Sequence, residues 1–442
     1  MFARIYVWFF ECYKSVFRLW ETSHNHYVAY LFICLIVAYL LGRAYIKVKH
    51  PFWSIQPVMH VYDVYSWFFK RGIIRPELPT QNKFCDFKRV ETRPFDKVTE
   101  ALVTDFVYMI QSHFLKNEGN VFNPKKNNVV PYFVGHGSPS YWSFYWEKER
   151  LILNATESAS TEIIDHNKLL GVISSRPLHV TIYKSGERAG FDVYYVDYLC
   201  VDKGRRSKGI APLLIQTHEY NQSVLNQSIQ VSLFKREGVL TGIVPLCAYD
   251  TYIFSMANWC EPIAQNAGIT IAPCGKENVK YLLPLFSRDD LYDIVIAPSV
   301  GNMIELVQTD NIFIYMMIYE DEVVGAYFFK NPCVTIQQGD RAISCYASIY
   351  NSKASCIQHN KASRSQWLDH FVHCFKMSLA TVLKKGGNDP YKHCIIENVG
   401  SNSLIVDNLL LKNSPIAVSP TAYFFYNFAY PTFNPKNVLI LN

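Results

Sequence analysis

Hydrophobic residues are unevenly spread along the chain, and the longest apolar run lies near its beginning. Residues 22–42 carry no formal charge, and those from Tyr27 to Gly42 are almost continuously apolar. A helix needs about 20 residues to cross the hydrocarbon core of a bilayer, or about 17 at the lower limit. The run reaches that length if Arg43 extends its charge to the interface and residues 44–46 contribute. The pattern predicts a membrane helix over residues 22–46, with an interfacial or buried core helix as the alternative.

The flanks of this run indicate how it would sit in a membrane. From Phe2 to Trp20, aromatic residues alternate with Arg and Lys, as in an amphipathic helix at a membrane interface. Three basic residues and His50 follow the run closely, which favours a cytoplasmic body, although Lys14 and Arg18 oppose that orientation. We expect residues 1–50 to anchor the protein to a membrane and the remaining residues to be cytoplasmic.

The body of the chain alternates between apolar stretches typical of strands and longer ones typical of helices, which predicts a mixed α+β structure. One arrangement occurs twice: residues 167–173 and 321–327 each combine a polar turn, an apolar pair, a glycine and an apolar strand. Each precedes a second predicted strand, over 193–201 or 343–350, and then a predicted helix, over 211–225 or 367–383. The pattern favours two copies of one unit, although hairpins of this composition are common.

Composition and charge narrow the functional classes. The chain has 442 residues, half of them hydrophobic, with 20 Gly and 21 Pro, which excludes a disordered or collagen-like protein and allows two domains of ordinary size. Residues 1–50 hold six Lys or Arg and two Glu, so they carry +4 of the total charge of +6. The near-neutral remainder argues against a nucleic-acid-binding surface. Twelve cysteines without a CxxC pair or zinc-ligand spacing indicate reduced thiols.

The stretch most informative about chemistry is a strand-like run followed by a basic turn and a helix. The run is Tyr194–Val201, and the helix starts with Pro212 in its first turn, where a missing N–H is harmless. Arg206-x-x-Gly209-x-Ala211 places small residues at that helix N-terminus, where main-chain N–H groups and the helix dipole favour a phosphate. Positive charge is supplied by Arg205, Arg206 and Lys208. The pattern predicts a phosphate-binding loop, with a solvated basic turn as the alternative.

This turn resembles the acyl-CoA loop of the GNAT acyltransferase superfamily, R/Q-x-x-G-x-A/G. The longer string is similar to the N-myristoyltransferase signature, close to N-F-L-C-V-x-x-x-x-R-S-K-R-L-A-P, and stands here as DYLCV (197–201) and RSKGIAP (206–212). Two further segments agree: FWSIQPV (52–58) resembles the family's F-W-x-T-Q-P-V, and YFFYNF (423–428) resembles its Y-Y-L-Y-N-W. The segments occur in family order and at family spacing, so the resemblance covers roughly residues 51–442.

The resemblance implies a fold and a reaction. The implied fold has two tandem GNAT-like lobes that share a saddle-shaped mixed sheet: an acyl-CoA-binding lobe over 51–265 and a peptide-binding lobe over 266–442. The implied activity is transfer of the tetradecanoyl group from myristoyl-CoA, a co-substrate, to the N-terminal glycine amine of a protein or peptide. No prosthetic group and no metal are implied.

The resemblance also implies roles for particular residues. Main-chain N–H groups of Tyr198 and Leu199 would form the oxyanion hole, and the α-carboxylate of Asn442 would be the base for the amine. The implied acyl-CoA contacts are Phe52, Trp53, Leu199, Cys200, Val201, Arg206, Ser207, Lys208, Gly209, Ile210 and Ala211. A nucleophilic Cys200, with His218 or His179 as its base, is an alternative, but the family's cysteine forms no acyl-enzyme. The histidines show no metal-ligand spacing.

The segments that would bind the peptide depart from the family pattern. An acidic run after the family's N-Y-V-E is replaced by HFLKNEGN (113–120), which keeps one Glu. The family's Y-T-A-G is replaced near FKREG (234–238), and its R-Y-W-H-R by AYDTY (248–252), without the His. We therefore expect acyl-CoA binding and a less basic acceptor. The alternatives are another acyl-CoA-dependent N-acyltransferase and a drifted acyl-CoA-binding membrane scaffold.

Overall fold

The computed structural model describes residues 11, 14–15, 26–114, 120–153, 162–184, 187–238, 242–257, 259, 268–336, 339–358, 364–385 and 390–442. The amphipathic helix expected over Phe2–Trp20 lies almost entirely outside these residues. The helices are α2 (His26–Lys49), α3 (Val64–Phe68), α4 (Glu100–His113), α5 (Lys126–Val129), α6 (Ile210–Leu225), α7 (Val300–Gln308), α8 (Ser355–Gln358), α9 (Arg364–Lys384) and α10 (Asn402–Leu410).

The strands form one large mixed sheet and one small two-stranded sheet, β1 with β17. Their bounds are β1 (Gly72–Ile73), β2 (Val90–Pro94), β3 (Asn120–Phe122), β4 (Tyr141–Leu153), β5 (Glu162–Lys184), β6 (Glu187–Val201), β7 (Val231–Glu237), β8 (Cys247–Ser255), β9 (Ile269–Pro273), β10 (Ile294–Ala297), β11 (Ile312–Tyr319), β12 (Glu322–Lys330), β13 (Val334–Ile336), β14 (Asp340–Tyr350), β15 (Tyr391–Glu397), β16 (Ala417–Tyr426), β17 (Phe428–Ala429) and β18 (Val438–Ile440). Among the described residues the large sheet has 16 strands, with a main path β18-β10-β5-β6-β7-β16-β8-β15-β14-β12-β11-β9.

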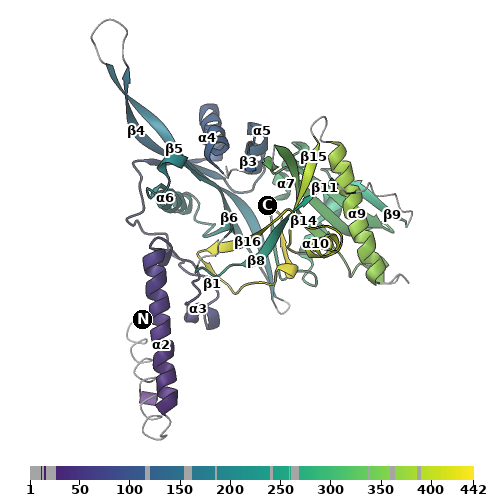
Figure 1. Ribbon diagram of the computed structural model, residues 1–442, viewed down its shortest axis with the longest axis horizontal. Helices are drawn as coiled ribbons and strands as arrows, with labels where there is room; N and C mark the ends of the chain where they lie inside the picture. The colour runs from purple at the N-terminus through teal and green to yellow at the C-terminus, as the bar shows by residue number, and fades with distance from the viewer. Residues whose placement is uncertain are drawn as a thin grey trace.

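The arrangement expected to occur twice has the same order of elements in both places. In the first, antiparallel β5 and β6 lead through α6 to β7, which pairs parallel with β6. In the second, antiparallel β12 and β14 lead through α9 to β15, which pairs parallel with β14. The strands and helices predicted from the two stretches are therefore confirmed. Both groups belong to the same sheet, with α4 and α6 packed on one part and α9 and α10 on the other (Figure 1).

Equivalent glycines allow both long helices to approach the sheet closely. A Cβ added to Gly171 on β5 would lie 2.7 Å from Leu214 Cδ1 of α6 and 3.2 Å from the Cys200 carbonyl oxygen. A Cβ added to Gly325 on β12 would lie 3.1 Å from the Ile349 carbonyl oxygen and 3.3 Å from the ring of Phe371 on α9. These distances are shorter than ordinary van der Waals contact, so a side chain at either position must push its neighbours aside.

The N-terminal helix α2 projects away from the body (Figure 1). Its apolar stretch, Val28–Lys49, has 22 residues with a mean hydropathy of 1.9 and is almost entirely exposed. At 1.5 Å per residue this stretch is about 33 Å long, close to the thickness of a bilayer core. The C-terminal end of α2 is fixed to the body by Ile46, which is buried against Gly242. A buried core helix, the alternative considered for this segment, does not describe α2.

Candidate active site

The centre of the candidate site is a β-bulge. The register between β5 and β6 shifts between the pairs Val172–Cys200 and Ser174–Asp197. Two residues of β6, Tyr198 and Leu199, therefore lie opposite a single residue of β5. Tyr198 has a φ of +48°, which is unusual for a residue with a side chain. Its ring lies in the aromatic cluster around Phe106, with the two ring centroids 5.9 Å apart.

One main-chain N–H group of the bulge already donates a hydrogen bond to a neighbouring side chain. The Tyr198 N–H, predicted as half of an oxyanion hole, donates to Asp197 Oδ1 at 2.8 Å. The Ser174 hydroxyl donates to the Asp197 carbonyl oxygen at 3.1 Å, which holds the peptide group before the bulge. Asp197 therefore orients the Tyr198 amide and also places a carboxyl group beside it.

Beyond this point β6 and β7 separate. Their parallel pairing runs from Val193 with Val231 to Val196 with Phe234 and then stops, although β6 continues to Val201. The edge of β6 that carries Tyr198–Val201 is therefore not paired with β7. A separation of two parallel strands next to a bulge is a natural place for an extended ligand to enter a sheet, because main-chain groups are left available there.

The turn after β6 leads into a helix, α6, whose N-terminus has no side-chain cap. Asp202 accepts the Gly204 N–H at 2.7 Å and starts a short 3₁₀ turn, Lys203–Arg205. Gly209, with a φ of +79°, stands at the N-cap of α6, and no side chain caps the helix. The first N–H groups of this 16-residue helix therefore lack a side-chain acceptor, as the predicted phosphate-binding role requires.

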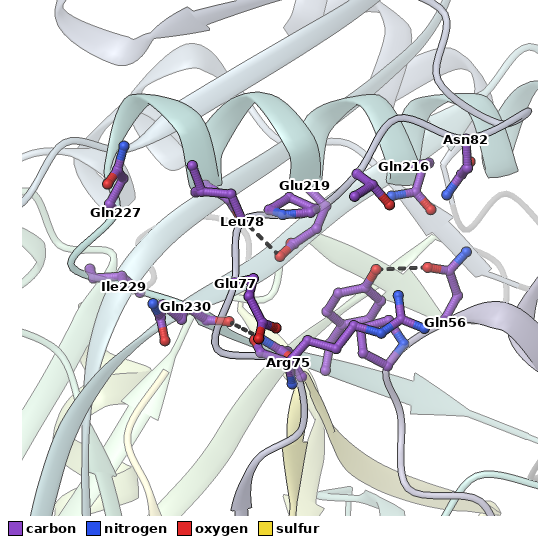
Figure 2. Close-up of a pocket in the computed structure, with 16 residues that line it drawn as sticks. Gln56, Arg75, Glu77, Leu78, Asn82, Gln216, Glu219, Gln227, Ile229 and Gln230 are labelled. Atoms are coloured by element: carbon purple, nitrogen blue, oxygen red, sulfur yellow. Dashed lines mark hydrogen bonds between the residues drawn. The ribbon is translucent and has the colours of Figure 1, made fainter. Parts of the chain in front are cut away.

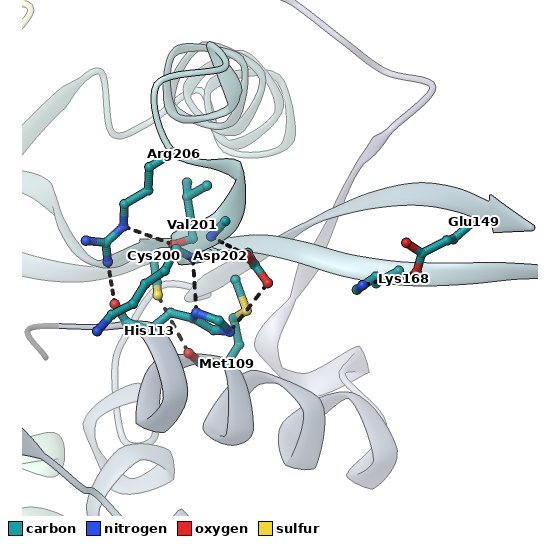
Figure 3. Close-up of polar contacts among 10 residues, drawn as sticks. Met109, His113, Glu149, Lys168, Cys200, Val201, Asp202 and Arg206 are labelled. Carbon is teal, nitrogen blue, oxygen red and sulfur yellow. Dashed lines mark hydrogen bonds and ion pairs between the residues drawn. The ribbon is translucent and has the colours of Figure 1, made fainter. Parts of the chain in front are cut away.

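The basic residues of the turn have different positions. Arg206 donates to the His113 carbonyl oxygen at the end of α4 and to the Val201 carbonyl oxygen at 3.4 Å (Figure 3). The Lys203 N–H donates to His113 Nδ1 at 3.1 Å. Arg206 therefore joins the turn to α4 rather than pointing freely to a ligand, whereas Lys208 is exposed on the turn.

Cys200 is packed against α4. Its thiol lies 3.7 Å from the Met109 carbonyl oxygen, and burial raises its pKa to about 12. His218, considered as its base, instead has hydrogen bonds to Ser143 at 2.7 Å and Ser175 at 2.9 Å, and burial lowers its pKa to about 3. The protonated, unassisted thiol fits a packing role and not a nucleophilic one.

Phe52 and Trp53 lie on the β7 side of the opening. The Trp53 ring stacks on Phe234, the last residue of β7 paired with β6, with centroids 5.5 Å apart. Phe52 is buried and contacts the Trp53 ring edge to face at 5.1 Å. The structure thus places the predicted acyl-CoA contacts on both sides of the separated strands: these aromatics next to β7, and residues 198–211 along β6 and the start of α6.

A polar cavity of about 480 Å³ lies between the second half of α6 and the segment that follows Trp53 (Figure 2). Two of its lining side chains, Gln56 and Gln216, are buried, and Gln56 Nε2 and Gln216 Oε1 have no hydrogen-bond partner. Glu219 also lines the cavity, and its burial raises the pKa of the carboxyl group to about 7. The other lining residues are Pro57, Arg75, Glu77, Leu78, Pro79, Thr80, Asn82, Ser223, Gln227, Ile229, Gln230, Tyr426 and Asn427.

Glu219 should make stability depend on pH. Its pKa is raised from 4.5 to about 7, so its stabilising contribution is complete below pH 4.5 and is lost as the pH rises through 7. We expect the free energy of unfolding to fall by about 2.5 kcal/mol between pH 5 and pH 8 through this group, at about 1.4 kcal/mol per pKa unit. In Glu219→Gln, urea denaturation should give a free energy of unfolding that no longer falls in this way between pH 5 and pH 8. Glu277→Gln, an exposed control, should keep it.

Asn442 contacts one member of a cluster of charged residues, Lys330. The Lys330 ammonium donates to the Asn442 main-chain oxygen at 3.3 Å, and burial lowers the pKa of Lys330 to about 8. Glu397 pairs with Lys235 at 3.0 Å. Burial alone would raise the pKa of Glu397, but the two lysines outweigh it and hold the pKa below its usual value. Arg176 is nearby and fully buried.

This cluster was missed by sequence reasoning. Lys235 belongs to the segment that departs from Y-T-A-G, but its partner on β15 is far away in sequence. The available signal was a single cation close to an apolar run, as at Arg176 and Lys330. Among the described residues, no group of three His, Cys, Asp or Glu could hold a metal ion.

The segment that carries the bulge and the turn matches a known family. Residues 155–247 match the model of the myristoyl-CoA:protein N-myristoyltransferase N-terminal domain. The resemblance to the N-myristoyltransferase family is confirmed. Glycylpeptide N-tetradecanoyltransferase 2 of Danio rerio is 23% identical over 206 residues, and that of Bos taurus is 22% identical over 215. Each alignment covers 46% of this chain but only 37% of the relative's length.

Solved N-myristoyltransferases have the same fold over a longer part of the chain. The Saccharomyces cerevisiae enzyme with bound myristoyl-CoA superposes with a TM-score of 0.65 at 16% identity, covering 89% of this chain and 99% of that one. Another structure of the yeast N-myristoyltransferase with myristoyl-CoA gives 0.66 at 15% identity, with coverages of 92% and 100%. The expected mixed sheet of the N-myristoyltransferase fold is therefore confirmed.

Proposed function

We propose that this chain is a membrane-anchored acyltransferase that moves the tetradecanoyl group of myristoyl-CoA to the N-terminal glycine amine of a protein. The observation that carries the proposal is the β-bulge at Tyr198–Leu199 followed directly by the uncapped N-terminus of α6. The match of residues 155–247 to the N-myristoyltransferase model supports it. We further propose that the two repeated units are GNAT-like lobes, divided as 51–265 and 266–442.

The reaction assigns a task to each part of the site. The carboxylate of Asn442 takes one proton from the glycine ammonium. The free amine attacks the thioester carbonyl, main-chain N–H groups of Tyr198 and Leu199 stabilise the oxyanion, and the carbon–sulfur bond breaks. The proton that the attacking nitrogen then loses goes to the sulfur, so CoA leaves as the thiol. The α6 N-terminus and Lys208 face the phosphates, while the side chains proposed to contact the rest of the acyl-CoA are Phe52, Trp53, Leu199, Cys200, Val201, Ser207, Gly209, Ile210 and Ala211.

Asp197 should slow this reaction. Its carboxyl group accepts the Tyr198 N–H at 2.8 Å, whereas the family signature has Asn at this position. A negative charge beside a developing oxyanion raises the transition-state energy. We expect Asp197→Asn to increase kcat for transfer about tenfold, which corresponds to about 1.4 kcal/mol. Asp192→Asn, at an exposed position on the same strand, should leave kcat unchanged. A decrease in Asp197→Asn would contradict this arrangement.

Binding and turnover must be measured separately to test the enzyme. Isothermal titration with myristoyl-CoA should give saturable binding, and acylation of peptides that begin with glycine should follow. Binding without turnover on any acceptor would refute the enzyme and identify an acyl-CoA-binding membrane protein. Absence of myristoyl-CoA binding would refute both the enzyme and the acyl-CoA-binding membrane protein.

The polar cavity favours a second candidate, an acyl-CoA-dependent N-acyltransferase with a shorter or more polar acyl group. An aliphatic chain placed there would leave Gln56 Nε2 and Gln216 Oε1 buried without partners, which is costly. Affinities for acyl-CoA donors from two to sixteen carbons would decide between the candidates. A maximum at fourteen carbons supports the first, and a maximum at short chains supports the second.

The exposed apolar helix α2 supports the proposal of a membrane anchor with a cytoplasmic body. A chain that starts at residue 50 should move from the membrane fraction to the soluble fraction, because burial of the apolar residues of α2 in lipid is lost. Fractionation of cells that express either chain measures this. Persistence of the shortened chain on membranes would contradict the anchor.

A further inference from the structure

Arg176 on β5 is a buried cation that forms no ion pair with any described carboxylate. The residue is only 1% exposed, and its Nε and Nη1 have no hydrogen-bond partner. No carboxylate of the described residues forms an ion pair with it. An unpaired charge inside a protein is costly, and the cost is recovered when an anion binds to it.

The guanidinium is positioned by aromatic rings next to the bulge. Its central carbon lies 5.3 Å from the ring centroid of Tyr132 and 5.2 Å from that of Tyr195. Tyr195 is the register partner of Arg176 on β6 and precedes Tyr198 by three residues. The cation is therefore held close to the main chain where the proposed reaction takes place.

The neighbouring carboxyl groups already have partners. Glu397 is paired with Lys235 and accepts the hydroxyl of Tyr249. Asp197 accepts the Tyr198 N–H. Lys330 is close enough for Arg176 to repel its charge, donates to Asn442 and keeps part of its surface exposed. Two nitrogens of the guanidinium, Nε and Nη1, thus have no described partner, and Lys330 beside it is partly exposed.

We propose that Arg176 binds a carboxylate that the acyl acceptor carries close to its reacting amine. The inference rests on the proposed function and specifies its acceptor. Arginine is suited to this task because its planar group stays charged and donates several hydrogen bonds to a carboxylate. The loss of acidic residues from segment 113–120 agrees with an acceptor that is not basic. The carboxylate belongs either to an acidic side chain after the N-terminal glycine or to a free amino acid.

The test compares acceptors that differ only in charge. With the full chain, Gly-Asp-Ala-Ala should be acylated with a KM about tenfold lower than Gly-Asn-Ala-Ala, a difference typical of one charge-assisted contact. In Arg176→Met the two KM values should be equal, while the affinity for myristoyl-CoA is unchanged. Arg188→Met, at an exposed position on β6, should keep the preference. Free glycine as acceptor identifies the source: faster transfer to it than to either peptide assigns the α-carboxylate.

The outcomes separate this inference from the proposed function. If no acceptor is acylated, binding of glycyl-aspartate to the protein saturated with CoA still tests the anion site by calorimetry. Binding to the wild type but not to Arg176→Met supports the site without an enzyme. If the wild type uses or binds the Asp and Asn ligands equally, the carboxylate site at Arg176 is refuted. A preference for the Asp ligand that persists in Arg176→Met also refutes it. If that variant does not fold, Arg176→Lys, which keeps the charge but lacks the planar group, should reduce the preference without removing it.

Discussion

A short glycine–serine tail added after Asn442 is expected to reduce acyl transfer by about 10²–10⁴-fold, the usual contribution of a general base. The tail converts the proposed catalytic carboxylate into a neutral amide. It also meets a crowded environment, because Val438–Leu441 is buried and β18 pairs in parallel with β10. The Asn442 oxygen is moreover already within 3.3 Å of Lys330. Initial rates with a saturating peptide measure the effect.

Two measurements show whether the loss is chemical. Affinity for myristoyl-CoA should be unchanged in the extended chain, because β6 and α6 are not altered. The same tail placed before residue 1 should leave transfer intact. An extended chain that remains fully active would show that Asn442 is not the base.

Gly171→Val should lower the affinity for myristoyl-CoA by about 10- to 100-fold, which corresponds to the 1–3 kcal/mol typical of overpacking. A side chain here meets Leu214 at 2.7 Å and the Cys200 carbonyl oxygen at 3.2 Å. Leu214 is fully buried, so we expect α6 to shift and to carry its N-terminus with it. Calorimetric titration of the folded variant measures the change.

The second repeated unit offers a matched control. Gly325→Val should produce similar crowding under α9, with a comparable loss of stability, but it should not move α6. Gly137→Ala, where a Cβ would meet nothing within 4 Å, should change neither property. Equal losses of affinity in Gly171→Val and Gly325→Val would show that general destabilisation, and not the position of α6, is responsible.

Local pattern was sufficient for the β6–α6 part of the site. The apolar run before Val201, the small residues at Gly209 and Ala211, and Pro212 in the first turn all specify main-chain geometry within one segment. The strand and the helix could be predicted because residues that are neighbours in the sequence determine both. The two glycines of the repeat were visible for the same reason, although their contact with the helices was not.

Long-range side-chain contacts were not predictable in this way. Lys330 meets Asn442 across 112 residues, and Lys235 meets Glu397 across 162. Their meeting depends on which strands become neighbours in the sheet, and no local pattern encodes that order. The hydrogen bond from Arg206 to the His113 carbonyl oxygen, at the end of α4, is a further contact that no local pattern indicated.

The proposed membrane anchor α2 would confine the proposed reaction to the vicinity of the membrane surface. The helix ends at Lys49, and Phe52 and Trp53 at the opening follow within four residues. Even fully extended, four residues span only about 14 Å. A donor that partitions into the bilayer and an acceptor tethered beside it would meet the opening by lateral diffusion, at an effective concentration set by area and not by volume. The acylated product would also be released next to lipid, without carrying its new chain through water.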